Sequence, residues 1–515
     1  MKSLDSRYTQ RIQNGNIKMK RKIMSRVLSM KIVTGLLFLS CWPGFATAQQ
    51  VLTLAKATDI AMSNSPTIQH SKMSLDKSEE SLNVQKLALK SQFSLNIIPY
   101  SQTNDRSFDS RDAAYYTNWN KSSSGSFNIT QPLKWTDGTI KLKDELGYQK
   151  AYSDKSNLTT SSYSNSVSFN LTQPLFTYNR TLMSLKALEL NLENTKLNFA
   201  IQMLSLEQRI ATSFYNLYES KVSLDIAVDE LKNQQMSYEI IKGKVDAGLS
   251  ASEELYQAEL NLLSSKASLE NRQVSLANSY DSFKQLIGLP LGDSIDVEAD
   301  IAFQQVNVDL QKAIDYALKF RMELRQRSIS ILNAQDDLIR TAAQNEFKGN
   351  MNLSLGVKGI DTDLSDIYKT PTNTVGASIS FDIPIWDWGQ KKSRVNVSRI
   401  AIKDVQLSSE EDKTNMVIAI NQAYRNLSNL VSQIEIARQN LQLAQRTYDI
   451  NLERYKYGDL TSMDLNLYQS QLSQKRTSLT ASQIDYKLAL LNLKIITLWD
   501  FEKNQPVATM QAVDK

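Results

Sequence analysis

The chain has 515 residues, with 59 Lys and Arg, 54 Asp and Glu, one histidine and one cysteine. Nine of the basic residues and a single acid fall within residues 1–48, so the remaining chain carries a net charge of −3. This charge provides no basic excess for binding nucleic acid. One histidine, His70, and one cysteine, Cys41, supply neither a metal-binding cluster nor a disulfide. No nucleophile motif accompanies His70, so we expect no catalytic site, no metal, no cofactor and no enzyme activity.

Residues 1–48 have the pattern of a secretory signal peptide. A basic segment precedes a short apolar run at 32–39, and Ala46-Thr47-Ala48 supplies the small residues for cleavage before Gln49. Lipid modification of Cys41 is a second interpretation, which the sequence leaves open. Beyond this region no run of about 18 apolar residues occurs, so we expect no membrane-spanning helix. An exported chain of this kind is either soluble in the periplasm or inserted as a β-barrel.

Long helices are the dominant prediction for the rest of the chain. No proline occurs between Pro174 and Pro290 or between Pro384 and Pro506. Because proline breaks helices, these two windows permit very long ones, and apolar residues recur in them at a period near 3.6. The predicted helices cover residues 54–90, 177–246, 251–287, 308–346, 388–456 and 461–498.

Strands are predicted between the short and the long helices. There, apolar residues alternate with Ser, Asn and Thr, which is typical of a strand with one apolar and one polar face. Four such segments occur, at 93–97, 167–171, 351–357 and 377–383. A further hairpin is predicted from 127–133 and 140–142, with its turn at Asp137-Gly138.

The order of these segments indicates an internal duplication. LAKATDIA at 54–61 matches LQKAIDYA at 310–317, and QPLF at 173–176 matches IPIW at 383–386. We therefore predict a signal peptide at 1–48, a first repeat at 49–300, a second repeat at 301–500 and a tail at 501–515. The two offsets differ by 46 residues, which places an insertion within about 100–165 of the first repeat. We expect the extra hairpin to lie beside the first pair of strands.

Two similar turns interrupt the longest helical patterns. DAGLSASEEL at 246–255 and KYGDLTSMDL at 456–465 share a glycine, a serine four residues later and an acid six residues later. Gly248 and Gly458 favour a left-handed conformation, which allows a helix to end and the chain to reverse. The sequence thus predicts two equivalent helix–turn–helix reversals.

The predicted fold class is mainly α with a membrane β-barrel contribution. Four core strands per chain are too few to close a membrane barrel, which needs about eight or more. Because an open sheet edge cannot face lipid, several copies must share one barrel in a cyclic oligomer. The long antiparallel coiled-coil helices would then form an α-barrel at one end of that transmembrane β-barrel.

The chain resembles the outer-membrane efflux protein family, the TolC-like channels. The resemblance covers essentially all of 50–500. In chain order its marks are LTLAKATDIAMSNSPTIQ, LTQPLF, the first turn segment, LIGLPLG and the second turn segment, and several of them occur twice. It implies a homotrimer in the outer-membrane lipid, with its helical part in the periplasm. It also implies a passive exit duct of a tripartite efflux pump or type I secretion system, opened by a periplasmic adaptor and an inner-membrane transporter.

The resemblance assigns roles to the residues of the two turns. Gly248, Leu249, Gly458 and Leu460 would be the tips that contact the adaptor. Glu254 and Asp464 would face the lumen as a constriction of carboxylates, and Tyr455 would help to hold the closed state. Some members of the family carry a basic residue where Leu460 stands, so a salt bridge at that position is not expected.

Simpler interpretations of the same residues stay open. Glu254 and Asp464 suit the first turn of a helix, and Thr461 with Asp464 forms a capping-box pattern. The glycines could be turn residues alone, and Tyr455 could simply pack between helices. An alternative to the channel is a periplasmic coiled-coil scaffold or adaptor-like protein, which would have no need of the alternating strands. Drugs, metal ions, detergents and secreted polypeptides would all use the same duct.

Overall fold

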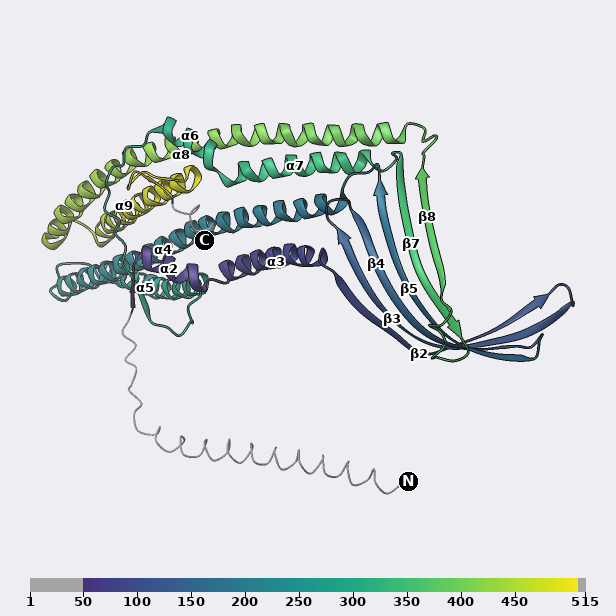
Figure 1. The fold of residues 1–515 in the computed structure, drawn as a ribbon. Helices are drawn as coiled ribbons and strands as arrows, with labels where there is room; N and C mark the ends of the chain where they lie inside the picture. The colour runs from purple at the N-terminus through teal and green to yellow at the C-terminus, as the bar shows by residue number, and fades with distance from the viewer. Residues whose placement is uncertain (1–49, 508–515) are drawn as a thin grey trace, which may run out of the picture. The chain divides into compact units, whose positions relative to one another are not determined.

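The computed structural model describes residues 50–507 (Figure 1). The predicted signal peptide, Cys41 and the end of the predicted tail beyond residue 507 lie outside the described residues. Residues 53–291 and 297–507 belong to one compact unit. Residues 50–52 and 292–296 belong to a small second unit. It holds β1 (Gln50–Leu52) and the first two residues of β6 (Ile295–Val297), the strand that pairs with β1.

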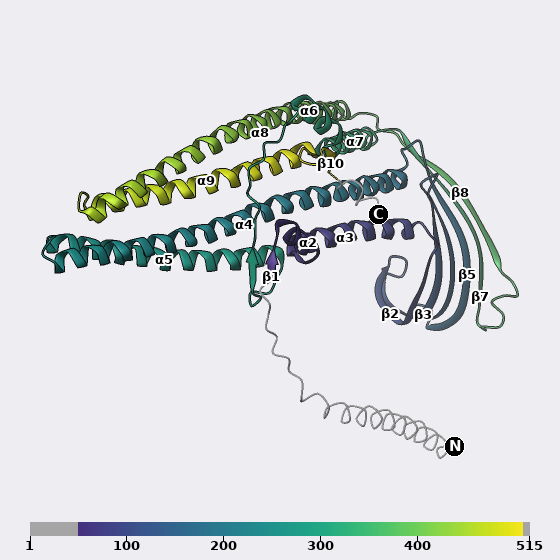
Figure 2. The ribbon, with the colours of Figure 1, turned by 90° about the vertical axis from the view of Figure 1, so that its left-hand side faces the viewer.

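Two long helical hairpins make up nearly half of the larger unit (Figures 1 and 2). α4 (Arg180–Asp246) reverses into α5 (Ser252–Ile287), and α8 (Gln390–Tyr457) reverses into α9 (Ser462–Thr497). α4 has 67 residues and α8 has 68, which corresponds to about 100 Å each at 1.5 Å per residue. All four helices were predicted to within three residues at each end. Their existence and bounds are therefore confirmed.

The other two predicted helices, 54–90 and 308–346, were wrong in one respect, because each is broken into two. Residues 54–90 form α2 (Leu54–Asn64) and α3 (Pro66–Ala88). The break falls at Ser65, whose ψ of 129° is extended, because a following proline disfavours the helical conformation. Residues 308–346 form α6 (Leu310–Phe320) and α7 (Met322–Ala342).

The second break has no proline, and it depends on tertiary contacts. Arg321 also has an extended ψ, 128°, and its guanidinium donates a hydrogen bond to the carbonyl oxygen of Ile495 in α9 at 3.0 Å. α3 packs along α4, and α7 packs along α8, so each broken helix lies beside a long one.

The elements repeat at fixed offsets. α2, α3 and β2 (Gln92–Asp109) each begin 256 residues before α6, α7 and β7 (Lys348–Asp361), and α4 and α5 begin 210 residues before α8 and α9. β3 (Ala114–Leu133) and β4 (Gly138–Ser153) have no counterpart in the second half. The predicted repeat boundaries themselves stay a prediction.

Six of the strands form one antiparallel sheet, in the order β2-β3-β4-β5-β7-β8, and β9 (Trp499–Asp500) pairs separately with β10 (Gln505–Pro506). The four predicted strands are present, with β5 at Leu158–Leu175 and β8 at Thr372–Asp382. They are longer than predicted, because mostly polar residues continue each strand beyond its predicted apolar core. The expected count of four core strands with a hairpin beside them needs correction. The hairpin β3–β4 is hydrogen-bonded between β2 and β5, so six strands share one sheet.

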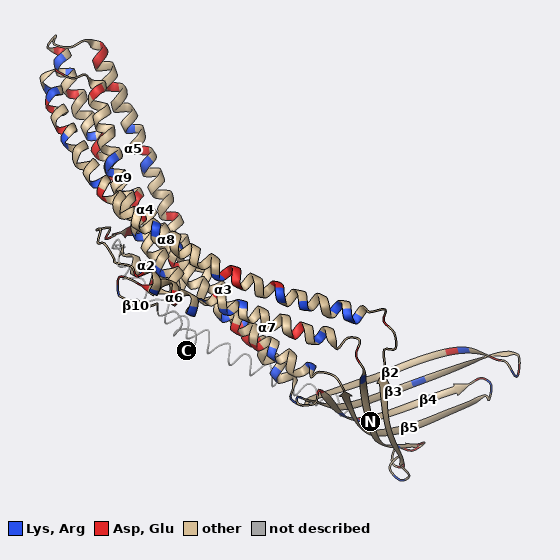
Figure 3. Ribbon diagram, turned by 90° about the horizontal axis from the view of Figure 1, so that it is seen from above, with Lys and Arg blue, Asp and Glu red and all other residues tan. Residues whose placement is uncertain are grey.

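One face of this sheet is apolar and the other is polar. Phe93, Leu95, Phe169, Leu355 and Ile379 are all exposed and all lie on the same face, which we call the apolar face. Lys, Arg, Asp and Glu are spread along the helices, whereas most of each strand is free of them (Figure 3). None of the helices within residues 50–507 has the length and apolarity of a membrane-crossing segment.

The helical core lies between the hairpins and the short helices. Ile420 and Ile434 of α8 pack with Leu493 of α9 and with Ala313 of α6. The buried Tyr486 hydroxyl accepts a hydrogen bond from the Val306 amide at 3.0 Å, which fixes the chain that leads into α6. These contacts hold α6 against the base of the α8–α9 hairpin, at the end away from its turn.

Candidate functional site

The two helix reversals have the same backbone structure. Gly248 has φ of 72° and Gly458 has φ of 93°, the left-handed conformation that the sequence predicted. In the first turn the Leu249 amide donates to the carbonyl of Lys244 at 2.7 Å. In the second turn the Asp459 amide donates to the carbonyl of Arg454 at 3.0 Å. This six-residue bond is the Schellman pattern of a glycine-terminated helix, and it occurs at corresponding positions 210 residues apart.

The ends of the two hairpins pack against each other through one apolar cluster. Its buried members are Ile241 of α4, Ala258 of α5, Tyr448 and Tyr455 of α8, and Leu465 and Leu472 of α9. All four long helices contribute to this cluster. The tips therefore form one packed body within the chain, which we call the tip cluster.

Tyr455 is the most constrained residue of the tip cluster. Its side chain is fully buried, and its hydroxyl both accepts a hydrogen bond from the Ser237 hydroxyl at 2.9 Å and donates to the Ser237 carbonyl at 3.1 Å. Lys244 of α4 donates to the Tyr455 carbonyl at 2.7 Å and lies 5.2 Å from the ring centre. Burial raises the pKa of Tyr455, so the hydroxyl stays protonated and able to donate at neutral pH.

Further polar contacts join α4 to α9 behind Tyr455. Gln234 donates to the Asn466 side chain at 2.7 Å, and Gln469 donates to the Glu230 carbonyl at 3.0 Å. Arg476 forms an ion pair with Asp229 at 3.1 Å. Together with the Tyr455–Ser237 pair they form a line of contacts, which we call the hairpin bridge. Sequence reasoning missed all of it except Tyr455, because helix periodicity does not reveal which polar side chains meet across two helices.

Glu254 and Asp464 occupy the same position, the third residue of the helix after each turn. Asp464 accepts a hydrogen bond from the Thr461 hydroxyl at 2.6 Å, while its amide donates back to that oxygen at 3.2 Å. The predicted helix cap is therefore confirmed at this residue. Glu254 accepts from the Ser250 hydroxyl at 2.9 Å. Each acid is bonded within its own turn, and in the part of the chain described here no hydrogen bond or ion pair joins the two.

The surface of the tips is unusually apolar for a pair of turns. Leu249 is 78% exposed, whereas Leu460 is half-buried against the tip cluster. Tyr457 and Met463 flank the second turn and are 82% and 72% exposed. Sequence reasoning missed these two, although their apolar character beside a glycine turn was a usable signal.

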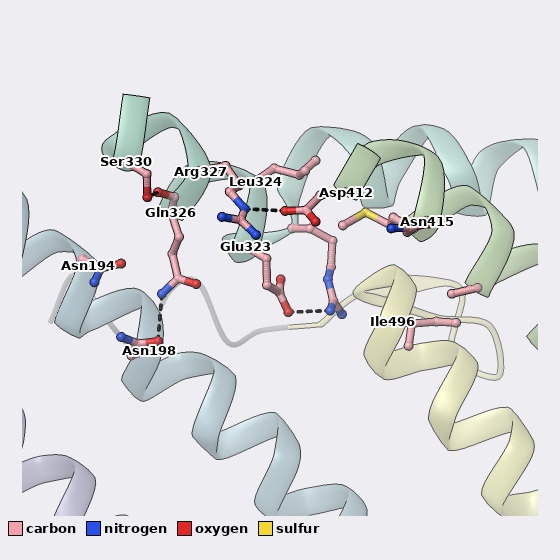
Figure 4. Close-up of a pocket in the computed structure, with 13 residues that line it drawn as sticks. Asn194, Asn198, Glu323, Leu324, Gln326, Arg327, Ser330, Asp412, Asn415 and Ile496 are labelled. Atoms are coloured by element: carbon pink, nitrogen blue, oxygen red, sulfur yellow. Dashed lines mark hydrogen bonds and ion pairs between the residues drawn. The ribbon is translucent and has the colours of Figure 1, made fainter. Parts of the chain in front are cut away.

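A polar cavity of about 660 Å³ lies between α4, α7, α8 and α9, far along the chain from the turns (Figure 4). Across it, Arg327 of α7 pairs with Asp412 of α8, and Gln326 donates to Asn198 of α4 at 2.8 Å. Within residues 50–507 no group of three His, Cys, Asp or Glu side chains is arranged to hold a metal. The cavity is thus a polar junction between helices.

Comparison with known proteins gives consistent matches. A family model described as "Outer membrane efflux protein" matches residues 139–289 and 314–497, more than half of the chain. The cation efflux system protein CusC of Escherichia coli K12 is 22% identical over 269 residues, which are 50% of this chain and 56% of CusC. The outer membrane protein TolC of the same strain is 22% identical over 311 residues, 55% of this chain and 59% of TolC. The chain thus spans little more than half the length of these relatives.

Solved structures match over more of the chain. The Campylobacter jejuni CmeC outer membrane channel has a TM-score of 0.66 at 14% identity, covering 90% of this chain and 88% of CmeC. The crystal structure of CusC has a TM-score of 0.63 at 15% identity, covering 86% and 91%. At these identities the likeness concerns the fold alone.

Proposed function

Since the chain belongs to the outer membrane efflux protein family, we propose that three copies form the exit duct of a tripartite efflux pump or type I secretion system. The family consists of channel proteins of the outer membrane, which is where this chain is located. The duct would be a passive conduit, opened by a periplasmic adaptor and an inner-membrane transporter. The carrying observation is the pair of equivalent tips, joined by the hairpin bridge.

The long helices support assembly of several copies. α5 and α8 carry large apolar side chains that a single chain leaves exposed, at intervals along both helices. Exposed apolar surface of this extent needs a partner, and in a cyclic oligomer neighbouring copies would cover it. These residues include Leu260, Leu263, Val274, Val397, Ile400, Leu407, Ile418 and Leu443.

The hairpin bridge supports a closed state that contacts hold in place. Tyr455 and its Ser237 partner join α8 to α4, so separating the two hairpins would break both of their hydrogen bonds. An adaptor that docks on the exposed Leu249 and on the glycine turns at Gly248 and Gly458 could supply the energy for that separation. Leu460, which is half-buried, would contribute less to docking than Leu249.

Glu254 and Asp464 support a charged constriction. In a trimer they would contribute six carboxylates near one aperture, which would concentrate cations and repel anions. Their hydrogen bonds to Ser250 and Thr461 cap the helices and are compatible with this role, since a carboxylate has further lone pairs to face the lumen. The same carboxylates are the observation that favours a cation as the cargo.

Planar-bilayer recording with the purified protein tests this proposal. We expect small, cation-selective conductance, and loss of cation selectivity in the double variant Glu254→Ala, Asp464→Ala. Glu253→Ala with Asp459→Ala is a matched control, because these acids lie beside the first pair in the same turns. If both double variants show the same cation selectivity, the proposed constriction of Glu254 and Asp464 carboxylates is contradicted. A protein that never inserts would contradict the channel and favour a periplasmic scaffold.

A further inference from the structure

The inserted hairpin pairs with both of its neighbours along most of its length, with one register shift in the β2–β3 ladder between Ile98 and Ser101. β2 and β3 pair from Gln92, opposite Thr130, to Asp109, opposite Ala114. β4 and β5 pair along 15 successive positions. A hairpin that merely extended beyond a four-stranded wall would leave β2 paired with β5. Here β3 and β4 lie between β2 and β5.

The apolar face runs through the hairpin in register. One row of laterally paired residues crosses all six strands and is apolar at every position. It reads Phe93, Ile129, Leu142, Phe169, Leu355 and Val375. The next row lies on the opposite face and is small or polar at every position. It reads Ser94, Asn128, Lys143, Ser168, Gly356 and Thr374. β3 and β4 thus show the alternation of a strand between lipid and water, as the other four do.

The turn of the hairpin is anchored where the long helix begins. Asp137 accepts a hydrogen bond from the Thr181 amide of α4 at 3.0 Å, and Asn179 donates to the carbonyls of Lys134 and Trp135 at 2.8 and 3.0 Å. The β3–β4 turn is therefore held at the start of α4, level with the ends of the other strands.

The strands β3 and β5 end in the same way. Gln131 near the end of β3 donates to the Leu89 carbonyl at 3.1 Å, and Gln173 near the end of β5 donates to the Thr136 carbonyl at 2.6 Å. Each glutamine precedes Pro-Leu in the repeated segments FNITQPL and FNLTQPL, 42 residues apart. β3 and β5 are therefore equivalent at the ends where they lead toward the helices.

Aromatic residues mark two levels on these strands. Trp135 follows β3, and Trp386 and Trp388 follow β8. Because β3 and β8 run in the same direction, all three tryptophans lie beyond the same ends of the strands. Each of them is more than 70% exposed. Toward the other end, Trp119 stacks on Tyr152 at 5.8 Å within the hairpin. Aromatic girdles at two levels flank the apolar band of membrane barrels. The hairpin carries both.

Asp144, a charged residue among the apolar rows, runs against this pattern and has a partner. Asp144 stands on the apolar face in the row of Leu95 and Val167, and Asn165 of β5 donates to it at 2.8 Å. An acid on the lipid face is tolerated better than a basic residue. The hydrogen bond from Asn165 also lowers the cost of placing the Asp144 carboxyl in an apolar environment. Lys121 and Lys150 also stand opposite each other on this face, farther along the hairpin beside the Trp119–Tyr152 pair.

We propose that the hairpin is part of the membrane wall, so that three copies close a barrel of eighteen strands instead of twelve. The inference rests on the trimeric channel proposed above. β2 and β8 are the edge strands of the sheet, and unpaired strand edges cannot remain in lipid. The occupant of each edge is a second copy of this chain. Because each copy contributes an even number of strands, β8 of one copy runs antiparallel to β2 of the next.

The extra strands change the lumen in two ways. Barrel diameter grows roughly linearly with strand number, so eighteen strands give a barrel about 1.5 times as wide as twelve. The hairpin also brings Lys141, Lys143 and Glu145 to the polar face, where Lys143 pairs with Glu145. Their lateral neighbours on β3 and β5 are Asn, Ser and Thr. The hairpin therefore adds a net positive charge to the lumen of the membrane section.

Cysteine labelling tests whether the hairpin lies in the wall. In a Cys41→Ala background, Ile129→Cys and Leu142→Cys probe the apolar face, and Asn128→Cys and Lys143→Cys probe the polar face. Leu355→Cys and Gly356→Cys in β7 are controls from the same two rows. After reconstitution into lipid vesicles, a charged maleimide should label the polar-face cysteines several-fold faster, in the hairpin as in β7.

The outcomes separate the two proposals. Alternation in β7 with equal labelling of both hairpin faces overturns the eighteen-stranded wall and leaves the channel intact. Loss of alternation in β7 as well means that the sheet does not line a membrane, which overturns both. Alternation in both places supports both.

A deletion variant tests the predicted width of the β-barrel. Removing residues 114–155 joins Ala113 to Ser156 and presents FNLTQPL to β2 in place of FNITQPL. With polymers added from the side of the β-barrel, we expect the deletion variant to exclude smaller polymers than the full chain does. An unchanged size limit would contradict the wider barrel. If the variant does not fold, the labelling result decides.

Discussion

The replacement Tyr455→Phe isolates the contact that we propose holds the tips closed. It keeps the buried ring and removes the hydroxyl, which makes two hydrogen bonds with Ser237. A neutral hydrogen bond contributes about 0.5–1.5 kcal/mol net, so the closed state should lose about 1–3 kcal/mol. At 1.4 kcal/mol per tenfold change, the ratio of open to closed channels should rise roughly 5- to 150-fold.

Single-channel open probability in planar bilayers measures this ratio. Tyr448→Phe is the matched control, because Tyr448 is buried in the same tip cluster and its hydroxyl has no hydrogen-bond partner within residues 50–507. The control should leave open probability unchanged. Equal open probability for the two variants would refute the argument that the Tyr455–Ser237 pair restrains opening.

Three further predictions concern the tips and the start of α8. Gly458→Ala places a side chain at φ of 93°, and we expect a cost of roughly 1–2 kcal/mol, measured as faster hydrogen exchange of the Asp459 amide. Hydrogen bonds from the Lys391 and Gly389 amides lower the pKa of the Asp387 carboxyl. The ionised carboxylate therefore stabilises the start of α8. This stabilisation is fully present above the ordinary pKa of a carboxyl and is lost as the pH falls through the lowered pKa of Asp387. The protection factors of the amides at residues 389–393, which correct for the intrinsic pH dependence of exchange, should therefore fall in acid. Asp387→Asn should remove that dependence, and protection factors that do not change with pH in the unmodified protein would count against it. Leu249→Asp should abolish efflux by cells while the purified channel conducts normally, and Leu249→Met should retain efflux; loss of conductance would point to misfolding instead of lost docking.

Much of this fold was predictable because its signals are local. Helix bounds followed from proline-free windows and from Gly248 and Gly458, whose backbone conformations were expected from residue type. The breaks at Ser65 and Arg321 were missed for different reasons. The first had a local signal in Pro66, whereas the second is held by a contact with Ile495, which is distant in sequence.

The site was predictable in outline and not in detail. The turns and Tyr455 followed from the resemblance and the repeat, whereas Gln234, Gln469 and Arg476 were not identified. Polar residues on long helices are numerous, and only the packing of α4 against α9 determines which of them meet. The place of the hairpin had the same difficulty, since alternation predicts strands but not the order in which they pair.

The most direct test of the central claim is the assembly and conductance of the purified full-length protein. Native mass measurement of the detergent-solubilised protein, combined with planar-bilayer recording of the same sample, should give three copies per particle and discrete ion-conducting steps. Single copies that produce no conductance would contradict the account, because neither the apolar face of the sheet nor the paired tips would then have the role proposed for them.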